Sequence, residues 1–246
     1  IKLKKVFSPG SLLKLRSELI SLLKEEFKVD PDKEAYNRFL SLEMIWPDNK
    51  LLRAYVLSPR LGQISANLLE VSAVRLYHDN VLAKQSGCGR TPWHFDDHHF
   101  PLDTNDVVTA WAPAQPTPIE MGPLSFAYPL DVHELIKDVT FEKTGTGYDR
   151  EVSNIFSKNN VSVNATPFEL GEVSFHHNLN FHTASSNRTN CSRIALANTY
   201  YRDGARVINS PTMVSGDWQK FMPNVKPGDI AASPLNPICW PVKSEI

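Results

Sequence analysis

The sequence predicts a mainly β protein with flanking helices. Its early part carries apolar residues at helical spacing, whereas later stretches mix β-branched and apolar residues between turns rich in glycine and proline. Many antiparallel strands after a helical start are typical of a β-barrel or β-sandwich with helices packed outside. Periodicity alone leaves the choice between these two architectures open.

Residues 1–70 are expected to form a helical buttress against a sheet. Three helices are predicted there, over residues 9–28, 32–44 and 49–69. Leucines recur through the first of them with Lys, Arg and Glu between. Pro59 is expected to interrupt the third, because the residue before a proline resists the helical conformation.

Residues 71–208 are predicted to form the β core, within a single domain that spans residues 1–246. Strands are expected at residues 71–84, around His94, and at 106–114, 122–128, 161–165, 172–176 and 193–201. Residues 131–160 are charged and poorly periodic, and predict a short helix near 132–137 followed by a mobile loop through Gly145 and Gly147. Long irregular insertions are usually functional, so we expect a lid over the substrate there. Residues 209–246 predict an irregular tail.

Composition excludes several classes of function. A net charge of −1 lacks the basic excess that a nucleic-acid or membrane partner favours. No apolar run approaches the roughly 18 residues that cross a bilayer. Three cysteines without paired spacing favour a reducing compartment. We therefore expect a cytoplasmic protein, a monomer or weak homo-oligomer, whose partner is a small molecule.

The strongest chemical signal is His94-Phe95-Asp96. In an extended strand alternate side chains share a face, so His94 and Asp96 can grip a metal from one side. The candidate third ligand is His182, far downstream, and Arg193 follows it by eleven residues. Two histidines and one carboxylate form the facial triad of non-haem Fe(II) oxygenases. The same set can hold a catalytic zinc, and a hydrogen-bonded His–Asp pair is the structural alternative.

The chain resembles the phytanoyl-CoA dioxygenase-like branch of the Fe(II)/2-oxoglutarate oxygenases from about Val71 to Tyr201. Five segments carry the resemblance: Leu76–Lys84, Thr91–Asp96, Val108–Trp111, Glu120–Leu124 and His182–Arg193. It implies a double-stranded β-helix, also called a jelly roll or cupin-like core. It also implies that His94, Asp96 and His182 bind iron and that Arg193 binds the far carboxylate of 2-oxoglutarate.

The chain departs from the family pattern at three places. Phe95 stands where Gln is frequent, and Tyr128–Asp131 stands where a Gly-Ser-His is common. Ala184 replaces a serine whose hydroxyl can touch the co-substrate.

Four extra imidazoles lie near the ligand segments, at His98, His99, His176 and His177. His176 would share a face with His182 in an unbroken strand, but residues 178–180 predict a turn, and only His182 has the arginine eleven residues on.

Other polar residues are predicted to line the pocket. Trp111 is placed beside the co-substrate by the resemblance, with a plain core tryptophan as the alternative, and Thr109 shares its strand face. His78 and Asn80 share a face of their strand, and Lys84 follows on the same face. We place these three near the co-substrate because unpaired buried polar groups are costly.

The resemblance implies an enzyme that uses Fe(II), 2-oxoglutarate and O2, with ascorbate as the reductant in vitro. Such an enzyme oxidises a small molecule, by hydroxylation in the default case and by desaturation, ring closure or epimerisation in others. It converts 2-oxoglutarate to succinate and CO2. A zinc-dependent hydrolase and a non-catalytic cupin-like binding protein are the alternatives. The sequence does not identify the substrate.

Overall fold

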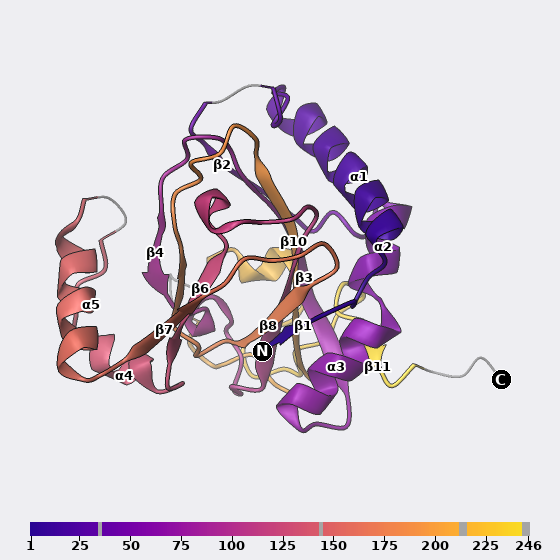
Figure 1. Ribbon diagram of the computed structural model, residues 1–246. Coiled ribbons are helices and arrows are strands. Elements are labelled where there is room, and N and C mark those ends of the chain that lie inside the picture. Colours follow the sequence, from indigo (N-terminus) through magenta and orange to yellow (C-terminus); the bar gives the residue numbers. More distant parts are fainter. Residues whose placement is uncertain (34–35, 143–144, 212–215, 243–246) are drawn as a thin grey trace.

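Two antiparallel sheets form the centre of the molecule, and helices cover the outside (Figure 1). The computed structural model describes residues 1–33, 36–142, 145–211 and 216–242. Within them the larger sheet has the strand order β1-β8-β5-β10-β3-β11, with β2 also paired to β3, and the smaller sheet has the order β4-β9-β6-β7. This is the jelly-roll, or double-stranded β-helix, architecture, and it confirms the predicted fold class.

The strands of the larger sheet are β1 (Lys2–Leu3), β2 (Phe39–Glu43), β3 (Val74–Lys84), β5 (Val107–Pro113), β8 (Val173–His177), β10 (Arg193–Arg202) and β11 (Ile238–Trp240). Those of the smaller sheet are β4 (Thr91–His94), β6 (Leu124–Tyr128), β7 (Ser162–Ala165) and β9 (His182–Ala184). Short 3-10 turns are η1 (Asp97–His99), η2 (Ile119–Met121) and η4 (Trp218–Lys220).

Three helices cover the outer face of the larger sheet: α1 (Pro9–Phe27), α2 (Lys50–Val56) and α3 (Pro59–Leu69). The α1 leucines at one helical face are fully buried and join the same apolar cluster as Ile194 and Leu196 of β10. The break between α2 and α3 falls at Ser58, as Pro59 predicts. Of the helices in the described residues, none is both long and apolar enough to span a membrane.

The predicted helix over residues 32–44 is wrong, because Phe39–Glu43 form strand β2 along the edge of β3. Leu40 and Leu42 face the apolar cluster under the helices. The alternation of apolar and polar residues here has a period of two, which favours a strand. The tail was expected to be irregular, yet its residues 238–240 add strand β11 to the other half of β3.

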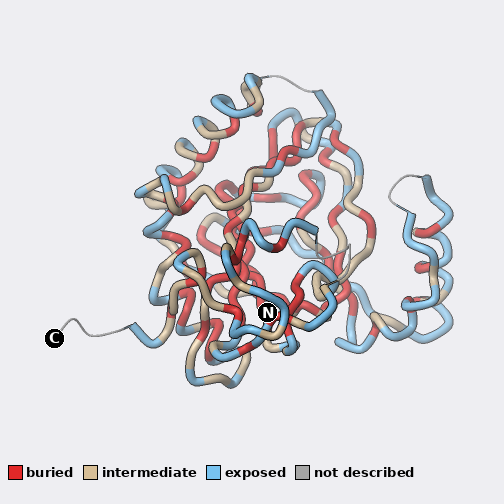
Figure 2. The backbone as a smooth tube through the Cα atoms, turned by 180° about the vertical axis from the view of Figure 1, so that it is seen from behind, coloured by how far each residue is buried: buried red, intermediate tan, exposed pale blue. Residues whose placement is uncertain are grey.

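Residues 131–160 fold into α4 (Val132–Ile136) and α5 (Gly147–Lys158). The predicted short helix is confirmed. The predicted loop through Gly147 is wrong, since Tyr148, Val152 and Phe156 are buried at a spacing of four residues, which is helical. They pack in one apolar cluster with Trp93 at the outer side of β4, while the other side of α5 is exposed (Figure 2).

The inner face of the larger sheet is more polar than its outer face. In β10, Ile194 and Leu196 point to the helices, whereas Arg193, Ala195 and Ala197 point towards the smaller sheet. The chain passes from the larger to the smaller sheet through the turn at residues 178–181, between β8 and β9. This turn was predicted, and it places the two strands on opposite sides of the space between the sheets.

Candidate active site

A cavity of about 480 Å³ is lined by residues of both sheets. Eight of its lining residues are the predicted site residues: His78, Asn80, His94, Asp96, Thr109, Trp111, His182 and Arg193. They come from five strands and one turn. Tertiary folding therefore collects all eight at one place, and no described residue of 131–160 lines this cavity.

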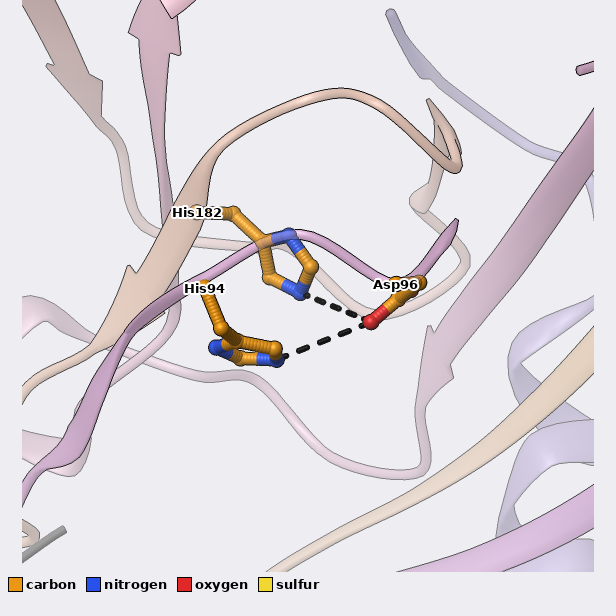
Figure 3. Close-up of side chains that lie close together, drawn as sticks. All are labelled: His94, Asp96 and His182. Atoms are coloured by element: carbon orange, nitrogen blue, oxygen red, sulfur yellow. Dashed lines mark ion pairs between the residues drawn. The ribbon is translucent and has the colours of Figure 1, made fainter. Parts of the chain in front are cut away.

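His94, Asp96 and His182 offer ligand atoms that all lie within 4.8 Å of one another. The Nε2 atoms of the two histidines are 3.6 Å and 3.9 Å from the same Asp96 oxygen, Oδ1 (Figure 3). His94 and His182 are direct partners across the β4–β9 pair. Cross-strand neighbours share a sheet face, so the pairing of the two strands sets the two imidazoles side by side.

Asp96 reaches this point by a turn and not by the strand alternation that its spacing from His94 suggested. Strand β4 ends at His94, and Asp96 has a helical backbone with φ −88° and ψ −14° at the start of η1. Its amide donates a hydrogen bond to the carbonyl of Asn178, at 2.8 Å. The turn between β8 and β9 thus anchors the carboxylate close to both imidazoles.

Both histidines are oriented by their second ring nitrogen. Nδ1 of His94 lies 2.8 Å from the carbonyl of Pro92, and Nδ1 of His182 lies 2.9 Å from the carbonyl of Asn180. Donation from Nδ1 leaves the Nε2 lone pair free, which is how metal-bound histidines are usually held. Burial lowers the pKa of each imidazole to about 4, so both are neutral at pH 7.

The carboxyl group of Asp96 stays ionised beside them. Burial alone would raise its pKa, but the surrounding imidazoles of His182, His176 and His94 hold it well below the usual range. Two neutral imidazole nitrogens and one carboxylate oxygen, all turned to one point, make a donor set that suits a divalent transition metal. The residues present therefore fit Fe(II).

Arg193 lies in the same cavity with only 2% of its surface exposed. One guanidinium nitrogen donates to the carbonyl of Gly122, while Nε has no partner within the described part of the chain. Burial lowers its pKa to about 10, so it remains a cation at neutral pH. Its guanidinium lies 5.2 Å from the Trp111 ring. An unpaired buried cation in a cavity is a site for an anion, and a guanidinium suits a carboxylate.

Gly122 has a positive φ of 70°, which favours glycine. A Cβ atom at this position would lie 2.2 Å from the carbonyl oxygen of Ser185. Only glycine fits, and its carbonyl is the one that holds Arg193. These two constraints explain why the Met121-Gly122-Pro123 segment has glycine at its centre.

The other predicted pocket residues differ in how they are paired. The hydroxyls of Thr109 and Thr199 are 3.0 Å apart, and Asn80 accepts a hydrogen bond from Ser41 at 2.8 Å. Trp111 Nε1 and His78 Nδ1 are buried with no partner among the described residues. These two atoms are therefore available to a bound molecule.

Lys84 was expected near the co-substrate, but it does not line the cavity. Its Nζ donates to the carbonyls of Ala184 and Ser185, at 3.2 Å and 2.8 Å. Burial, and then the charge of Arg193, lowers its pKa to about 7. Its observed contacts tie β3 to the smaller sheet.

Several lining residues were not identified from the sequence. Phe39, Ser41 and Glu43 reach the cavity from β2, Lys220 and Phe221 reach it from η4 and its end, and His176 reaches it from β8. Glu43 and Lys220 form an ion pair of 2.7 Å. The period-two pattern of β2 would have indicated the first three. No local pattern connects residues 216–221 to the site.

Fold and site together define a class: a jelly-roll protein with a candidate two-histidine, one-carboxylate metal centre and a buried arginine beside it. The family described as phytanoyl-CoA dioxygenase matches residues 1–195, which include all the predicted site residues. The chain belongs to this family, and so to the Fe(II)- and 2-oxoglutarate-dependent oxygenases. Comparison with curated protein sequences gives no significant match.

Solved structures share the fold at low identity. The non-heme alpha ketoglutarate dependent carbocyclase SnoK from nogalamycin biosynthesis is 22% identical, with a TM-score of 0.75 over 97% of this chain and 90% of that chain. The epimerase SnoN, in complex with Fe3+, alpha ketoglutarate and nogalamycin RO, is 18% identical, with a TM-score of 0.73 over 97% and 93%. EctD from S. alaskensis with bound Fe is 15% identical, with a TM-score of 0.65 over 84% and 74%.

Proposed function

We propose that His94, Asp96 and His182 hold Fe(II) and that Arg193 binds the distal carboxylate of 2-oxoglutarate. The enzyme then oxidises a small organic molecule in the rest of the cavity. The observation that supports this most is the meeting of two unrelated features in one cavity. Three metal donors lie within 4.8 Å of one another, and the same cavity contains a buried guanidinium that has no carboxylate partner among the described residues.

With Fe(II) and 2-oxoglutarate bound, such a centre uses O2 to convert 2-oxoglutarate to succinate and CO2 and to oxidise a substrate C–H bond. The protein supplies position and electrostatics. Asp96 contributes the negative charge that balances the metal, and the two imidazoles contribute neutral donors. Trp111 lies against Arg193, and its indole N–H has no partner in the part of the chain that the structure describes, which supports a role as a donor to the same co-substrate.

We place substrate entry along β2. Phe39 and Lys220 are exposed residues of the cavity lining, and the Glu43–Lys220 ion pair bridges β2 and η4 there. Further in, the cavity is lined by Phe100 and Phe221 around His78, whose ring centroids lie 6.3 Å and 4.8 Å away. These rings shape the wall against which a substrate would pack, near the metal donors.

The reaction type is proposed as hydroxylation, with desaturation, ring closure and epimerisation using the same centre. Structural neighbours include a carbocyclase and an epimerase, so the shared fold supports more than one outcome. Outcome depends on which C–H bond the wall of the cavity holds near the metal.

Succinate formation tests the proposal. Purified protein with Fe(II), ascorbate and O2 is expected to form succinate when 2-oxoglutarate is added, and none without it. A zinc-dependent hydrolase would act without 2-oxoglutarate and keep its activity in zinc. A cupin-like binding protein would bind 2-oxoglutarate or another ligand and form no succinate under any condition. Either result contradicts the proposed function.

A further inference from the structure

His176 is a buried imidazole in the cavity that the proposed metal centre does not use. It lies on β8, opposite Thr109 of β5, and is 6% exposed. Cross-strand partners share a face, and Thr109 and His176 both line the cavity. Its ring centroid is 4.7 Å from that of His182.

The two oxygens of Asp96 face different imidazoles. Oδ1 is the oxygen near His94 and His182, at 3.6 Å and 3.9 Å from their Nε2 atoms. Oδ2 lies 3.4 Å from Nε2 of His176. One oxygen of the Asp96 carboxylate therefore faces the candidate metal position, and the other faces His176.

The hydrogen-bond pattern separates His176 from the two candidate ligands. His94 and His182 each place Nδ1 against a backbone carbonyl, so their Nε2 atoms carry the lone pair. Nδ1 of His176 is buried without a partner in the described chain. A neutral imidazole has one N–H, and an ionised carboxylate only accepts hydrogen bonds. The proton of His176 therefore belongs on Nε2, facing Oδ2.

We propose that His176 is a positioning residue whose Nε2–H donates to Asp96 Oδ2 and keeps Oδ1 turned towards His94 and His182. The inference rests on the proposed iron site. Its physical basis is that groups hydrogen-bonded to a ligating carboxylate fix the orientation of that ligand and strengthen metal binding. Rotation of the Asp96 carboxyl group out of its present plane would break this hydrogen bond, so His176 fixes the orientation in which the carboxylate faces the two imidazoles.

Metal affinity of three variants tests this role, with Co(II) as the probe because its absorption reports on coordination and needs no turnover. His176→Phe keeps a ring and removes the donor, and is expected to weaken Co(II) binding about 10- to 100-fold. His176→Gln supplies an amide N–H from the same position and is expected to restore most of the affinity. Ser174→Ala is the matched control: it removes a buried hydroxyl two residues earlier on β8 that has no hydrogen-bond partner in the described segments, and should bind as the wild type does.

Two results would overturn the inference. Wild-type Co(II) affinity and absorption in His176→Phe would mean that His176 does not position Asp96. Complete loss of Co(II) in both His176→Phe and His176→Gln, with native circular dichroism, would make His176 a ligand and not a positioning residue. His182→Ala separates these results from failure of the iron site itself: if it binds Co(II) like the wild type, the proposed function is wrong whatever His176 does.

Discussion

Replacing Arg193 by methionine separates co-substrate binding from folding. Arg193 is 2% exposed and lacks a carboxylate partner among the described residues, so solvent screens its charge little. Removing one partner of a buried, hydrogen-bonded charge pair costs about 2 to 5 kcal/mol. Arg193→Met is therefore expected to raise the dissociation constant for 2-oxoglutarate roughly 30-fold to several thousand-fold.

Thermal unfolding of Co(II)-loaded protein gives the measurement without turnover. At a 2-oxoglutarate concentration about 100 times its dissociation constant, ligand binding stabilises the wild type by about 2.7 kcal/mol. For a chain of this size that corresponds to a rise in Tm of roughly 5 to 11 °C. Arg193→Met should show at most about a third of this rise at the same concentration.

The ligand-free variant provides the second arm of the test. Replacing a buried, unpaired charge by an apolar side chain of similar length leaves stability unchanged or raises it. Arg193→Met without ligand should therefore unfold no earlier than the wild type. Arg188→Met is the matched control, because Arg188 is exposed and lies between β9 and β10, five residues before Arg193. Unchanged 2-oxoglutarate affinity in Arg193→Met, or equal loss in Arg188→Met, would refute the assignment.

Three further predictions concern the metal, the insertion and pH. His182→Ala should lose tight Fe(II) binding and turnover with a native circular dichroism spectrum, whereas the exposed His98→Ala keeps both; full iron occupancy in His182→Ala would disprove its role. Fe(II) with 2-oxoglutarate should slow proteolysis within residues 131–160, because α5 packs against β4 beside His94. Equal cleavage rates with and without these ligands would mean that the segment does not respond to binding at the site. Burial lowers the pKa of His78 and His182 from 6.5 to about 4. Each imidazole is therefore protonated at a higher pH in the unfolded chain than in the folded protein. The free energy of unfolding of metal-free protein, measured by urea denaturation, should therefore fall from pH 6.5 towards pH 4, by at most about 1.4 kcal/mol per pH unit for each group, and a flat profile would contradict it.

The elements that local pattern predicted correctly are those whose apolar spacing matches a single period. Helix α1 buries one leucine face, and β10 alternates between the helices and the cavity, as its sequence indicates. Strand β2 is not predicted by local pattern because a run of five residues is too short to separate a strand from a helix. Its stability comes from pairing with the edge of β3, which no local window contains.

Asp96 reaches the candidate site by a different geometry from the one that its sequence spacing suggested. Spacing alone suggested that His94 and Asp96 share the face of one strand. The strand ends at His94, and Asp96 is brought back by a turn whose amide bonds to Asn178. The residue types were readable from the sequence because metal chemistry demands them, but their convergence depends on a contact across 82 positions of the chain.

By itself the sequence determined which residue types this protein offers for chemistry: the candidate metal donors, a candidate arginine for a carboxylate, and the apolar period of the longer strands. Those features are local, since residue type and period are properties of short segments. Only the tertiary structure decided that Lys84 bonds to backbone carbonyls, that Glu43 and Lys220 meet in the cavity lining, and that His176 faces the second oxygen of Asp96. Those relations join segments far apart in the chain, and they follow from which strands pair and which sheets face each other.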